Sequence, residues 1–297
     1  MPAPPLVSVA MAMRNAAASI ALALQSLIDQ SFADWELVLL DDGSSDASVA
    51  VARHFADPRI LIRSDGRSLG LAARLNEAVA AARGRYIARM DADDVAYPER
   101  FARQVAFLEQ HPEVDLLGTG AIIFDHAGLM IGQLPLRTSH REIAARPWQG
   151  YYLAHPTWMG RRGWFRQYPY DTRLSKAQDY DLLLRSHAAS CFAGLPELLL
   201  GYRQESLSLG KILATRMQLA QAALRHGKTC GLRQRAQPLL AAAQQAAKFG
   251  VDALAIATGL QYRMLRHRAL PVASGQREEW LQLWQKLNRE NSERCAA

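Results

Sequence analysis

Residues 1–95 alternate between short apolar runs and amphipathic runs, and this alternation constrains the fold more than any other feature. Apolar runs of strand length are separated by segments whose apolar residues have helical spacing, so the pattern predicts alternating strands and helices. The predicted strands are residues 6–13, 36–41, 59–63 and 85–90. Because they are apolar at almost every position, they are typical of a parallel sheet that helices cover on both faces. The sequence therefore predicts an α/β fold.

Turn and capping residues mark where the helices between these strands begin and end. Asparagine and serine favour the position before a helix, because their side chains accept hydrogen bonds from its first free N–H groups. Glycine favours helix ends, and proline favours the first helical turn. The expected signals are Asn15 before a helix to about Gln30, Ser44 or Ser45 before a second helix, Gly84 after the alanine-rich helix 69–83, and Pro98 at the start of another.

The rest of the chain continues with less regular elements and then changes in composition. From Lys211 onward the sequence is rich in alanine, glutamine and arginine, which predicts helix. We expect an α/β domain over residues 1–208 and a helical C-terminal region over 209–297. The elements expected in between are strands at 114–124, 155–161 and 198–203, a hairpin arm at 128–134 and a helix at 177–187; breaks in the helical region are expected at 227–231, Gly250 and Pro271.

The composition is that of a globular chain with a basic bias. Of the 297 residues, 49% are hydrophobic and 21% are charged, which is enough for a core without disulfides. Cys191, Cys230 and Cys295 are widely spaced and odd in number, so we expect reduced thiols in a cytoplasmic protein. No secretory signal is visible, nor any run approaching the ~18 apolar residues of a membrane span. The net charge of +7 indicates a polyanionic partner, or good solubility alone.

Two acidic clusters directly follow predicted strands. Asp41 and Asp42 close the second strand, and Asp91, Asp93 and Asp94 follow the fourth. Right-handed crossovers bring the carboxyl ends of parallel strands to one edge of the sheet, where such sheets bind their ligands. The two clusters are therefore expected to share one crevice.

The cluster after the fourth strand has the composition of a metal site. Three carboxylates within four positions raise one another's pKa by repulsion, and a divalent cation removes that penalty. Mg²⁺ and Mn²⁺ prefer oxygen ligands and are commonly shared with substrate phosphates. Asp91, Asp93 and Asp94 thus predict an anchor for a metal–diphosphate. The alternative is a solvated turn in which one aspartate caps a helix.

Three further features have both a functional and a structural interpretation. Asp41-Asp42-Gly43 either accepts hydrogen bonds from a base or ribose, with Gly43 at positive φ, or forms a turn into a helix. Arg74 lies one turn into its helix and either reaches the crevice or lies on the surface. Asp179 opens a helix, where an acid is most often a partner of the helix dipole.

Taken together, the motifs resemble the bacterial family 2 glycosyltransferases of the GT-A fold, over residues 6–208. Each motif is short, but five stand in the order and spacing of that family. The motifs are Val7-Ser8-Val9 with Arg14-Asn15, Leu40-Asp41-Asp42-Gly43-Ser44-Ser45-Asp46, Gly70 with Arg74 and Asn76, Gly84-Arg85-Tyr86-Ile87-Ala88 with Asp91-Ala92-Asp93-Asp94, and Gln178-Asp179-Tyr180-Asp181, supported by Pro98-Glu99-Arg100 with Gln104 and by His155-Pro156-Thr157.

The resemblance implies a fold and a reaction. The fold would be a mixed, mainly parallel, Rossmann-like sheet with helices on both faces, whose residues 1–95 bind the nucleotide and 96–208 the acceptor. The reaction would be an inverting transfer from a nucleotide-diphosphate sugar, with UDP as the family's default. Mn²⁺ or Mg²⁺ would neutralise the leaving diphosphate, while a carboxylate on the opposite face deprotonates the acceptor hydroxyl.

The resemblance also implies roles for individual residues, carried over by position. The same aspartates and arginines that were singled out above recur here with assigned partners. The implied roles are Asp179 as the base, Asp93 as the main metal ligand, Asp91 at the metal or ribose, Ala12, Arg14, Asp41 and Asp42 at the nucleoside, Arg74 near the base, and Asp94, His155, Trp158, Gln178 and Arg203 on the acceptor or diphosphate side.

Three positions depart from the family's pattern. The usual Pro-x-Tyr-Asn turn is Ala12-Met13-Arg14-Asn15, so the stacking aromatic is missing and Arg14 is expected to stack in its place. The helix of the base begins Gln178-Asp179 in place of Glu-Asp. Tyr202-Arg203 is followed by Gln204-Glu205, where the family often has a histidine, so Arg203 is expected to compensate at the diphosphate. These changes bear on donor choice and on activity.

Two groups of apolar residues have open interpretations. An aromatic group in the acceptor half either stacks on a sugar or lipid or packs in the core. A helical stripe near the C-terminus either lies on an anionic membrane or packs on the catalytic domain or a dimer partner, and we favour the second interpretation. The aromatic group is Trp148, Tyr151, Tyr152, Trp158 and Trp164, and the stripe is Trp280, Leu281, Leu283, Trp284 and Leu287.

The function predicted is that of a metal-dependent hexosyl- or N-acetylhexosaminyl-transferase of bacterial surface polysaccharide synthesis. Its partners would be a nucleotide-diphosphate sugar and a glycan or lipid-linked acceptor, met in the cytoplasm or peripherally on the inner membrane. The main alternative is a catalytically silent relative, which Gln178 and Glu205 motivate. A sugar-nucleotide pyrophosphorylase would need a glycine-rich loop where residues 12–18 have no glycine. No groove-reading motif supports nucleic-acid binding.

Overall fold

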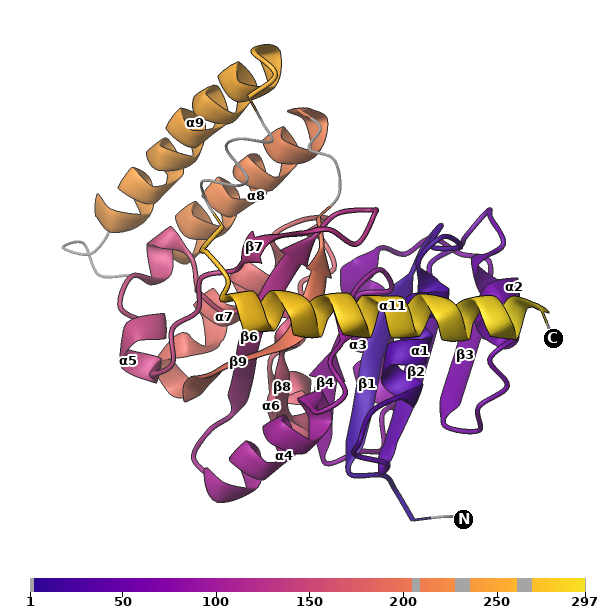
Figure 1. Ribbon diagram of the computed structural model, residues 1–297. Coiled ribbons are helices and arrows are strands. Elements are labelled where there is room, and N and C mark those ends of the chain that lie inside the picture. Colours follow the sequence, from indigo (N-terminus) through magenta and orange to yellow (C-terminus); the bar gives the residue numbers. More distant parts are fainter. Residues whose placement is uncertain (1–2, 205–208, 228–235, 261–268, 297) are drawn as a thin grey trace.

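The computed structural model describes residues 3–204, 209–227, 236–260 and 269–296 (Figure 1). Glu205, Cys230, the segment 228–231 of an expected helix break and the side chain of Cys295 lie outside these described residues.

A mixed sheet of nine strands runs through the described part of the chain, as the predicted α/β class requires. The strand order is β3-β2-β1-β4-β8-β6-β9-β5, and β7 pairs with β6. The first four strands are parallel to one another, whereas β8 is antiparallel to both β4 and β6. The strands are β1 Val7–Met13, β2 Trp35–Asp41, β3 Ile60–Ser64, β4 Tyr86–Arg89, β5 Val95–Ala96, β6 Leu116–Phe124, β7 Met130–Gln133, β8 Met159–Arg161 and β9 Phe192–Arg203.

Helices cover both faces of this sheet (Figure 1). Val9 and Met11 of β1 point to the core shared with α1, α2 and α4, and Ala10 points to the core shared with α3, α6 and α7. Both faces of β1 are therefore buried, although its side chains alternate. The helices are α1 Ile20–Ile28, α2 Ser48–Arg53, α3 Leu71–Ala81, α4 Arg100–Gln110, α5 His140–Ile143, α6 Arg162–Gln167, α7 Gln178–Ser186, α8 Leu209–Gly227, α9 Ala236–Ala257 and α11 Ser274–Ala296, with 3₁₀ turns η1 Pro147–Gln149, η2 His155–Thr157 and η3 His187–Ala189.

The four strands predicted in residues 1–95 are confirmed to within one residue at each end, but the helix starts there are not. α1 begins at Ile20 and not after Asn15, whose backbone is left-handed (φ 51°). The Asn15 side chain instead accepts a hydrogen bond from the Ser45 backbone N–H (2.9 Å) and so ties two loops together. α2 begins at Ser48, whose N–H donates to Asp46 (3.0 Å), so neither Ser44 nor Ser45 is its cap.

Three later boundary predictions also need correction. α3 ends at Ala81, so Gly84 does not close this helix. Gly84 is instead required for close packing, since a Cβ there would lie 2.6 Å from the backbone nitrogen of Ser8. Pro98 precedes α4 by two residues and does not occupy its first turn. The strand predicted at 155–161 starts only at Met159, because the preceding residues form η2 around Pro156, which has no N–H to donate to a sheet.

The C-terminal region consists of a helical pair, α8 and α9, and a separate long helix, α11. α8 ends at Gly227 as predicted, but α9 runs straight through Gly250. In Figure 1, α8 and α9 lie side by side beyond the sheet, while α11 crosses the α/β domain as far as α2. Trp280, Leu283 and Leu287 of α11 are buried against β5, β6 and α1, which confirms packing on the α/β domain for these three residues of the stripe, whereas Leu281 is exposed. Among the described residues, no helix is both long and apolar enough to cross a membrane.

Candidate active site

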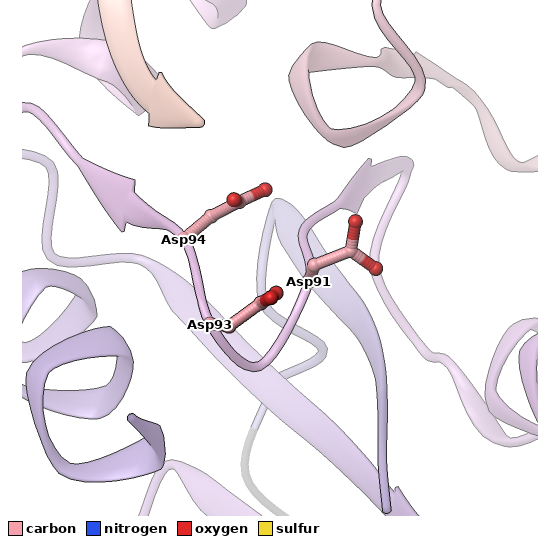
Figure 2. Close-up of side chains that lie close together, drawn as sticks. All are labelled: Asp91, Asp93 and Asp94. Carbon is pink, nitrogen blue, oxygen red and sulfur yellow. The ribbon is translucent and has the colours of Figure 1, made fainter. Parts of the chain in front are cut away.

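Asp91, Asp93 and Asp94 lie on the tight loop that joins β4 to β5. Figure 2 shows their side chains on one side of this loop, with the carboxylates of Asp93 and Asp94 pointing toward the side where Asp91 lies. One oxygen from each carboxylate lies within 4.8 Å of the other two. The grouping predicted from the sequence is therefore present at the carboxyl edge of the sheet.

Within this cluster, Asp94 is incompletely compensated by the described residues. Asp91 accepts from Arg89 Nη1 at 2.6 Å, and Asp94 Oδ1 accepts from the Arg203 backbone N–H at 2.9 Å. Asp94 Oδ2 is buried and has no hydrogen-bond partner within the described residues. Burial, together with the charges of Asp91 and Asp93, holds the pKa of Asp94 well above its usual range. A further positive charge would relieve this strain.

The donor set fits a hard divalent cation. Three carboxylates supply only oxygen ligands, which Mg²⁺ and Mn²⁺ prefer, and one buried oxygen still lacks a partner among the described residues. Arg203 closes the cluster from the side, because its Nε donates to the Asp93 carbonyl at 2.8 Å. Its guanidinium is stacked 4.7 Å above the ring of Phe124. The cluster is thus fixed in place before any ligand arrives.

A cavity of about 800 Å³ opens in front of the cluster. Asp91 and Asp93 form one part of its lining, and Asp179 and Gln178 at the start of α7 form another. Its walls come from seven elements that are distant in sequence, namely α3, β4, η2, α7, β9, α8 and α9. The remaining lining residues include Arg89, His155, Pro156, Lys176, Tyr202, Arg203, Lys211, Thr215, Arg216 and Asp252.

Asp179 is the second residue of α7, and the helix directly follows Ala177, whose left-handed backbone (φ 57°) sets the direction in which the helix starts. Burial raises the pKa of Asp179, and this outweighs the opposing effect of the Tyr180 backbone N–H and of Arg89. A carboxylate with a raised pKa is a stronger base than an exposed one. Its neighbour Gln178 is buried, and its Oε1 has no partner among the described residues.

His155 and Trp158 both lie in the wall segment around η2, but only His155 reaches the cavity. His155 Nε2 lies 2.8 Å from the hydroxyl of Tyr170, and burial holds its pKa well below the usual range, so the ring is neutral. Trp158 is fully buried, and its Nε1 donates to the Leu153 carbonyl. The acceptor-side role expected for Trp158 is therefore wrong, because an indole packed in the core cannot stack on a sugar.

The other aromatics of that group differ among themselves. Trp164 is buried, Trp148 and Tyr151 are half-buried against α7, and Tyr152 is exposed. None of them lines the cavity in front of the acidic cluster. The core-packing interpretation holds for Trp158 and Trp164 in particular.

Arg89 is a functional candidate that the sequence reasoning missed. It lies at the end of β4, only 3% exposed, and its guanidinium pairs with Asp91 through both terminal nitrogens. Arg89 Nε has no partner within the described residues. The available signal was a charge inside an otherwise apolar strand, two positions before Asp91 and hence on the same face.

Arg100 and Gln104 of α4 hold the two walls of the cavity together. The buried Arg100 guanidinium donates from Nη2 to the carbonyls of Arg89 (2.7 Å) and Pro156 (2.9 Å). Gln104 donates to the carbonyl of Thr157 at 2.8 Å. The arginine and glutamine stand four residues apart and so share one helix face. The sequence showed this spacing but not the strands that it connects.

The first acidic cluster is saturated by the protein. Asp42 accepts from the backbone N–H groups of Leu69 (2.6 Å) and Gly70 (3.0 Å) and from Arg74 Nε (3.2 Å). Asp41 accepts from the Ser44 N–H at 3.1 Å. Gly43 has a positive φ of 71°, as predicted. These carboxylates therefore hold the loops around Gly43 and Gly70 in position.

Arg74 is the centre of that network and is not a surface residue. Only 2% of its side chain is exposed, and it binds Asp42, Asp65 (2.6 Å) and Glu77 (2.8 Å). The hydrogen bond from Arg74 is the main cause that lowers the pKa of Asp65. The prediction that Arg74 lies near a base is not tested by these contacts.

Ala12 and Arg14 lie beside the first cluster at the rim of the sheet. Ala12 is half-buried, and the Arg14 side chain is 57% exposed, with Nη1 donating to Ser68 Oγ at 2.7 Å. Neither residue lines the 800 Å³ cavity, and neither do Asp41 and Asp42. The two acidic clusters share one edge of the sheet, but the expectation that they line one crevice is wrong for this cavity.

Comparison with known proteins gives relatives that are named as glycosyltransferases. EpsE of Bacillus subtilis (strain 168) is 35% identical over 187 residues, which cover 61% of this chain and 66% of EpsE. WfgD of Escherichia coli, a UDP-Glc:alpha-D-GlcNAc-diphosphoundecaprenol beta-1,3-glucosyltransferase, is 34% identical over 103 residues, or 35% of this chain and 41% of WfgD.

Solved structures with low sequence identity share the fold. S. aureus TarS 1-349 in complex with UDP-GlcNAc matches with a TM-score of 0.61 and 18% identity, covering 82% of this chain and 73% of TarS. The mannosyltransferase PcManGT from Pyrobaculum calidifontis, in complex with GDP-Man and Mn²⁺, matches with a TM-score of 0.61 and 16% identity. The match covers 96% of this chain and 88% of PcManGT. The fold is therefore the GT-A fold that the motifs implied.

The family model of glycosyl transferase family 2 spans β4, the acidic loop and the η2 wall of the cavity, and it ends before α7 and β9. Its match runs over residues 8–169, more than half of the chain. The chain therefore belongs to glycosyl transferase family 2.

Proposed function

We propose that this chain is an inverting glycosyltransferase that moves a hexosyl or N-acetylhexosaminyl group from a nucleotide-diphosphate sugar to a hydroxyl of a glycan or lipid-linked acceptor. The observation that carries the proposal is the cavity itself: Asp91 and Asp93 of the acidic cluster line the same space as a separate carboxylate of raised pKa, Asp179. Family membership and structural neighbours that bind UDP-GlcNAc or GDP-Man support the class of donor.

The donor diphosphate is assigned to Asp91, Asp93 and Arg203, and the nucleoside to the adjoining edge of β1 and β2. Arg14 is exposed there beside Ser68, so its guanidinium is available to stack on a base. Asp42 and Arg74 would shape the nucleoside site mainly through the loop at Ser68–Gly70 that they hold. UDP is the default nucleotide, and the UDP-GlcNAc complex of TarS supports it.

Asp93 and Asp91 are proposed to hold Mn²⁺ or Mg²⁺, and the Mn²⁺ complex of PcManGT supports a metal of this kind. A bound divalent cation supplies neutralisation of the negative charge that develops on the leaving diphosphate. Arg89 keeps the Asp91 carboxylate turned toward the cavity. Asp94 ties the loop to β9 through the Arg203 N–H, so the ligands keep their spacing.

Asp179 is proposed as the general base. It lines the same cavity as Asp91 and Asp93, so it can take a proton from an acceptor hydroxyl while the diphosphate leaves toward the acidic loop. Attack and departure on opposite faces of the sugar invert the configuration at its anomeric carbon. Gln178 and the neutral His155 line the same wall and can orient the acceptor by hydrogen bonds.

The acceptor is proposed to be a glycan or a lipid-linked glycan of bacterial surface polysaccharide synthesis, met at the cytoplasmic face of the membrane. The names of relatives support this, since WfgD acts on a diphosphoundecaprenol acceptor. Lys176 and Lys211 line the cavity and add positive charge where a phosphorylated acceptor would lie.

Calorimetric titration of UDP, GDP, dTDP and CDP, with and without Mn²⁺, tests the proposal on wild type and Asp93→Ala. We expect one nucleotide to bind tightly only with metal and only to the wild type. Nucleotide binding without turnover of any sugar nucleotide would favour a catalytically silent relative. Absence of binding by all four nucleotides would refute the donor site.

A further inference from the structure

The contact between α8 and α9 combines buried alanines with a buried polar group, and several large apolar side chains of both helices are exposed. Arg216 of α8 faces α9, where Nη2 pairs with Asp252 at 2.8 Å and Nη1 donates to Gln245 at 3.1 Å. Asp252 and Gln245 are both buried. In the core of a soluble helical pair, these positions would ordinarily carry the leucines.

The leucines of the pair lie on its surface instead. Of the fifteen large hydrophobic side chains exposed in the described residues, nine fall between residues 209 and 260. On α9 they are 56–66% exposed and follow helical spacing, with alanines filling the positions between them. We define the outer surface of the pair by eight of them: Leu209, Leu213, Met217 and Leu224 of α8 and Leu239, Leu240, Val251 and Leu254 of α9.

Such an arrangement needs an apolar neighbour outside the chain. An isolated exposed leucine is ordinary, but a whole helix face of this kind marks a surface that meets a protein or a lipid. α9 spans 22 residues and carries one charged side chain besides the buried Asp252, namely Lys248. The contact of buried alanines and a polar group shows that the pair does not bury these leucines against itself.

Charge decides between a second copy of the chain and a membrane. The sequence from 206 to 276 contains ten Lys and Arg residues and a single acidic residue, Asp252, so this segment alone exceeds the net charge of the whole chain. A two-fold dimer through this segment would bring two copies of its positive charge together, and they would repel. Anionic lipid headgroups attract a segment of this charge, while their acyl boundary accepts leucines.

We propose that the outer surface of α8–α9 docks on the surface of an anionic lipid bilayer. The pair is anchored to the α/β domain beside the cavity, through Arg225 with Asp171 (2.7 Å) and His226 with Asp181 (3.1 Å). Lys211, Thr215 and Arg216 of α8 also line the cavity. Docking would therefore bring the acceptor side of the cavity close to the bilayer; this last step rests on the proposed function.

Vesicle flotation of the full chain tests the docking. We expect the protein to float with vesicles of phosphatidylcholine mixed with phosphatidylglycerol and to bind phosphatidylcholine alone at least about tenfold more weakly. Raising the salt concentration should release the protein, because the electrostatic part of the attraction is screened.

Two double variants test whether vesicle binding depends on this surface in particular or on exposed leucines anywhere on the protein. Leu240→Gln with Leu254→Gln should weaken vesicle binding by at least about tenfold, since both side chains are more than half exposed. Leu61→Gln with Leu129→Gln changes two exposed leucines on the α/β domain and should bind vesicles as the wild type does. Thermal melting of each variant should match the wild type, because neither pair removes a buried side chain.

Three results would overturn the proposal. They are failure to bind phosphatidylglycerol vesicles at low salt, equal binding by the α9 variant and the wild type, and a wild-type dimer in sedimentation that the α9 variant turns into a monomer without any vesicle binding. Nucleotide titration of the same preparations keeps the two proposals apart. Vesicle binding with no nucleotide binding would leave the docking standing and remove only the donor site.

Discussion

Two acidic clusters follow two parallel strands of the same sheet, and the protein treats them in opposite ways. Asp42 after β2 receives two backbone N–H groups and the buried Arg74, so its charge is fully used in holding a loop. The cluster after β4 packs three carboxylates within 4.8 Å, and one buried oxygen of Asp94 lacks a partner among the described residues.

This difference teaches how to separate scaffolding acids from reactive ones. An acid whose oxygens are saturated by the chain contributes stability and has little left for a ligand. Acids that repel one another beside a cavity store unfavourable energy, which a cation can release. Only the second cluster faces a cavity with another carboxylate, Asp179, on its wall.

The largest expected effect is on turnover at Asp179. Asp179→Asn should lower kcat by about 10²- to 10⁴-fold while nucleotide affinity stays near wild type, because an amide cannot accept the acceptor proton. In the wild type, turnover should fall as pH drops through the raised pKa of Asp179, since protonation blocks the base. The kcat profile against pH, measured with the donor that calorimetry identifies, checks both. A variant with normal turnover would remove Asp179 from the mechanism.

Removal of a ligand from the second cluster should act on binding and not on folding. Asp93→Asn is expected to weaken Mn²⁺-dependent nucleotide binding by about 100-fold or more, because a hard cation loses a charged oxygen. The free energy of unfolding without metal should stay equal or rise, since a repulsive charge is gone. Calorimetry and urea unfolding on one preparation measure the two quantities. Strong destabilisation by this change would mean that the cluster is scaffolding after all.

The corresponding substitution in the first cluster should change the stability of the fold. Asp42→Asn is expected to lower the free energy of unfolding by about 3 kcal/mol, because the buried Arg74 loses a charged partner. Urea unfolding measures this loss. Asp46→Ser is the control at an exposed aspartate. It should lower the free energy of unfolding by less than Asp42→Asn does, since Asp46 lies at the surface. An unchanged stability for Asp42→Asn would contradict the scaffolding role.

The smallest effect is expected at Asp65, the exposed partner of Arg74. Asp65→Asn should lower the melting temperature less than Asp42→Asn does, because solvent screens the pair. The hydrogen bond from Arg74 lowers the pKa of Asp65, so its contribution is present above the unfolded pKa and disappears as pH falls through the folded one. The melting curves of wild type and variant should therefore differ at neutral pH and converge at strongly acidic pH. A difference that grows toward acid pH would disprove this pairing.

The sequence by itself determined the positions of the strands β1–β4, because their nearly continuous apolar runs are typical of a parallel sheet that helices cover. It also determined that Asp91, Asp93 and Asp94 lie together, since they stand on one short loop directly after a strand. The positive φ at Gly43 was predictable for the same local reason. Information within a few neighbouring residues was sufficient in each case.

Only the tertiary structure decided which acids are saturated and which aromatics are core. Asp42 accepts a hydrogen bond from the backbone of Leu69, 27 residues away in the sequence, and Arg100 donates one to the carbonyl of Pro156, 56 residues away. Trp158 is buried because α6 and α7 cover it, which no local pattern shows. These contacts join segments that are distant along the chain, and their energies depend on burial and geometry that exist only after the chain has folded.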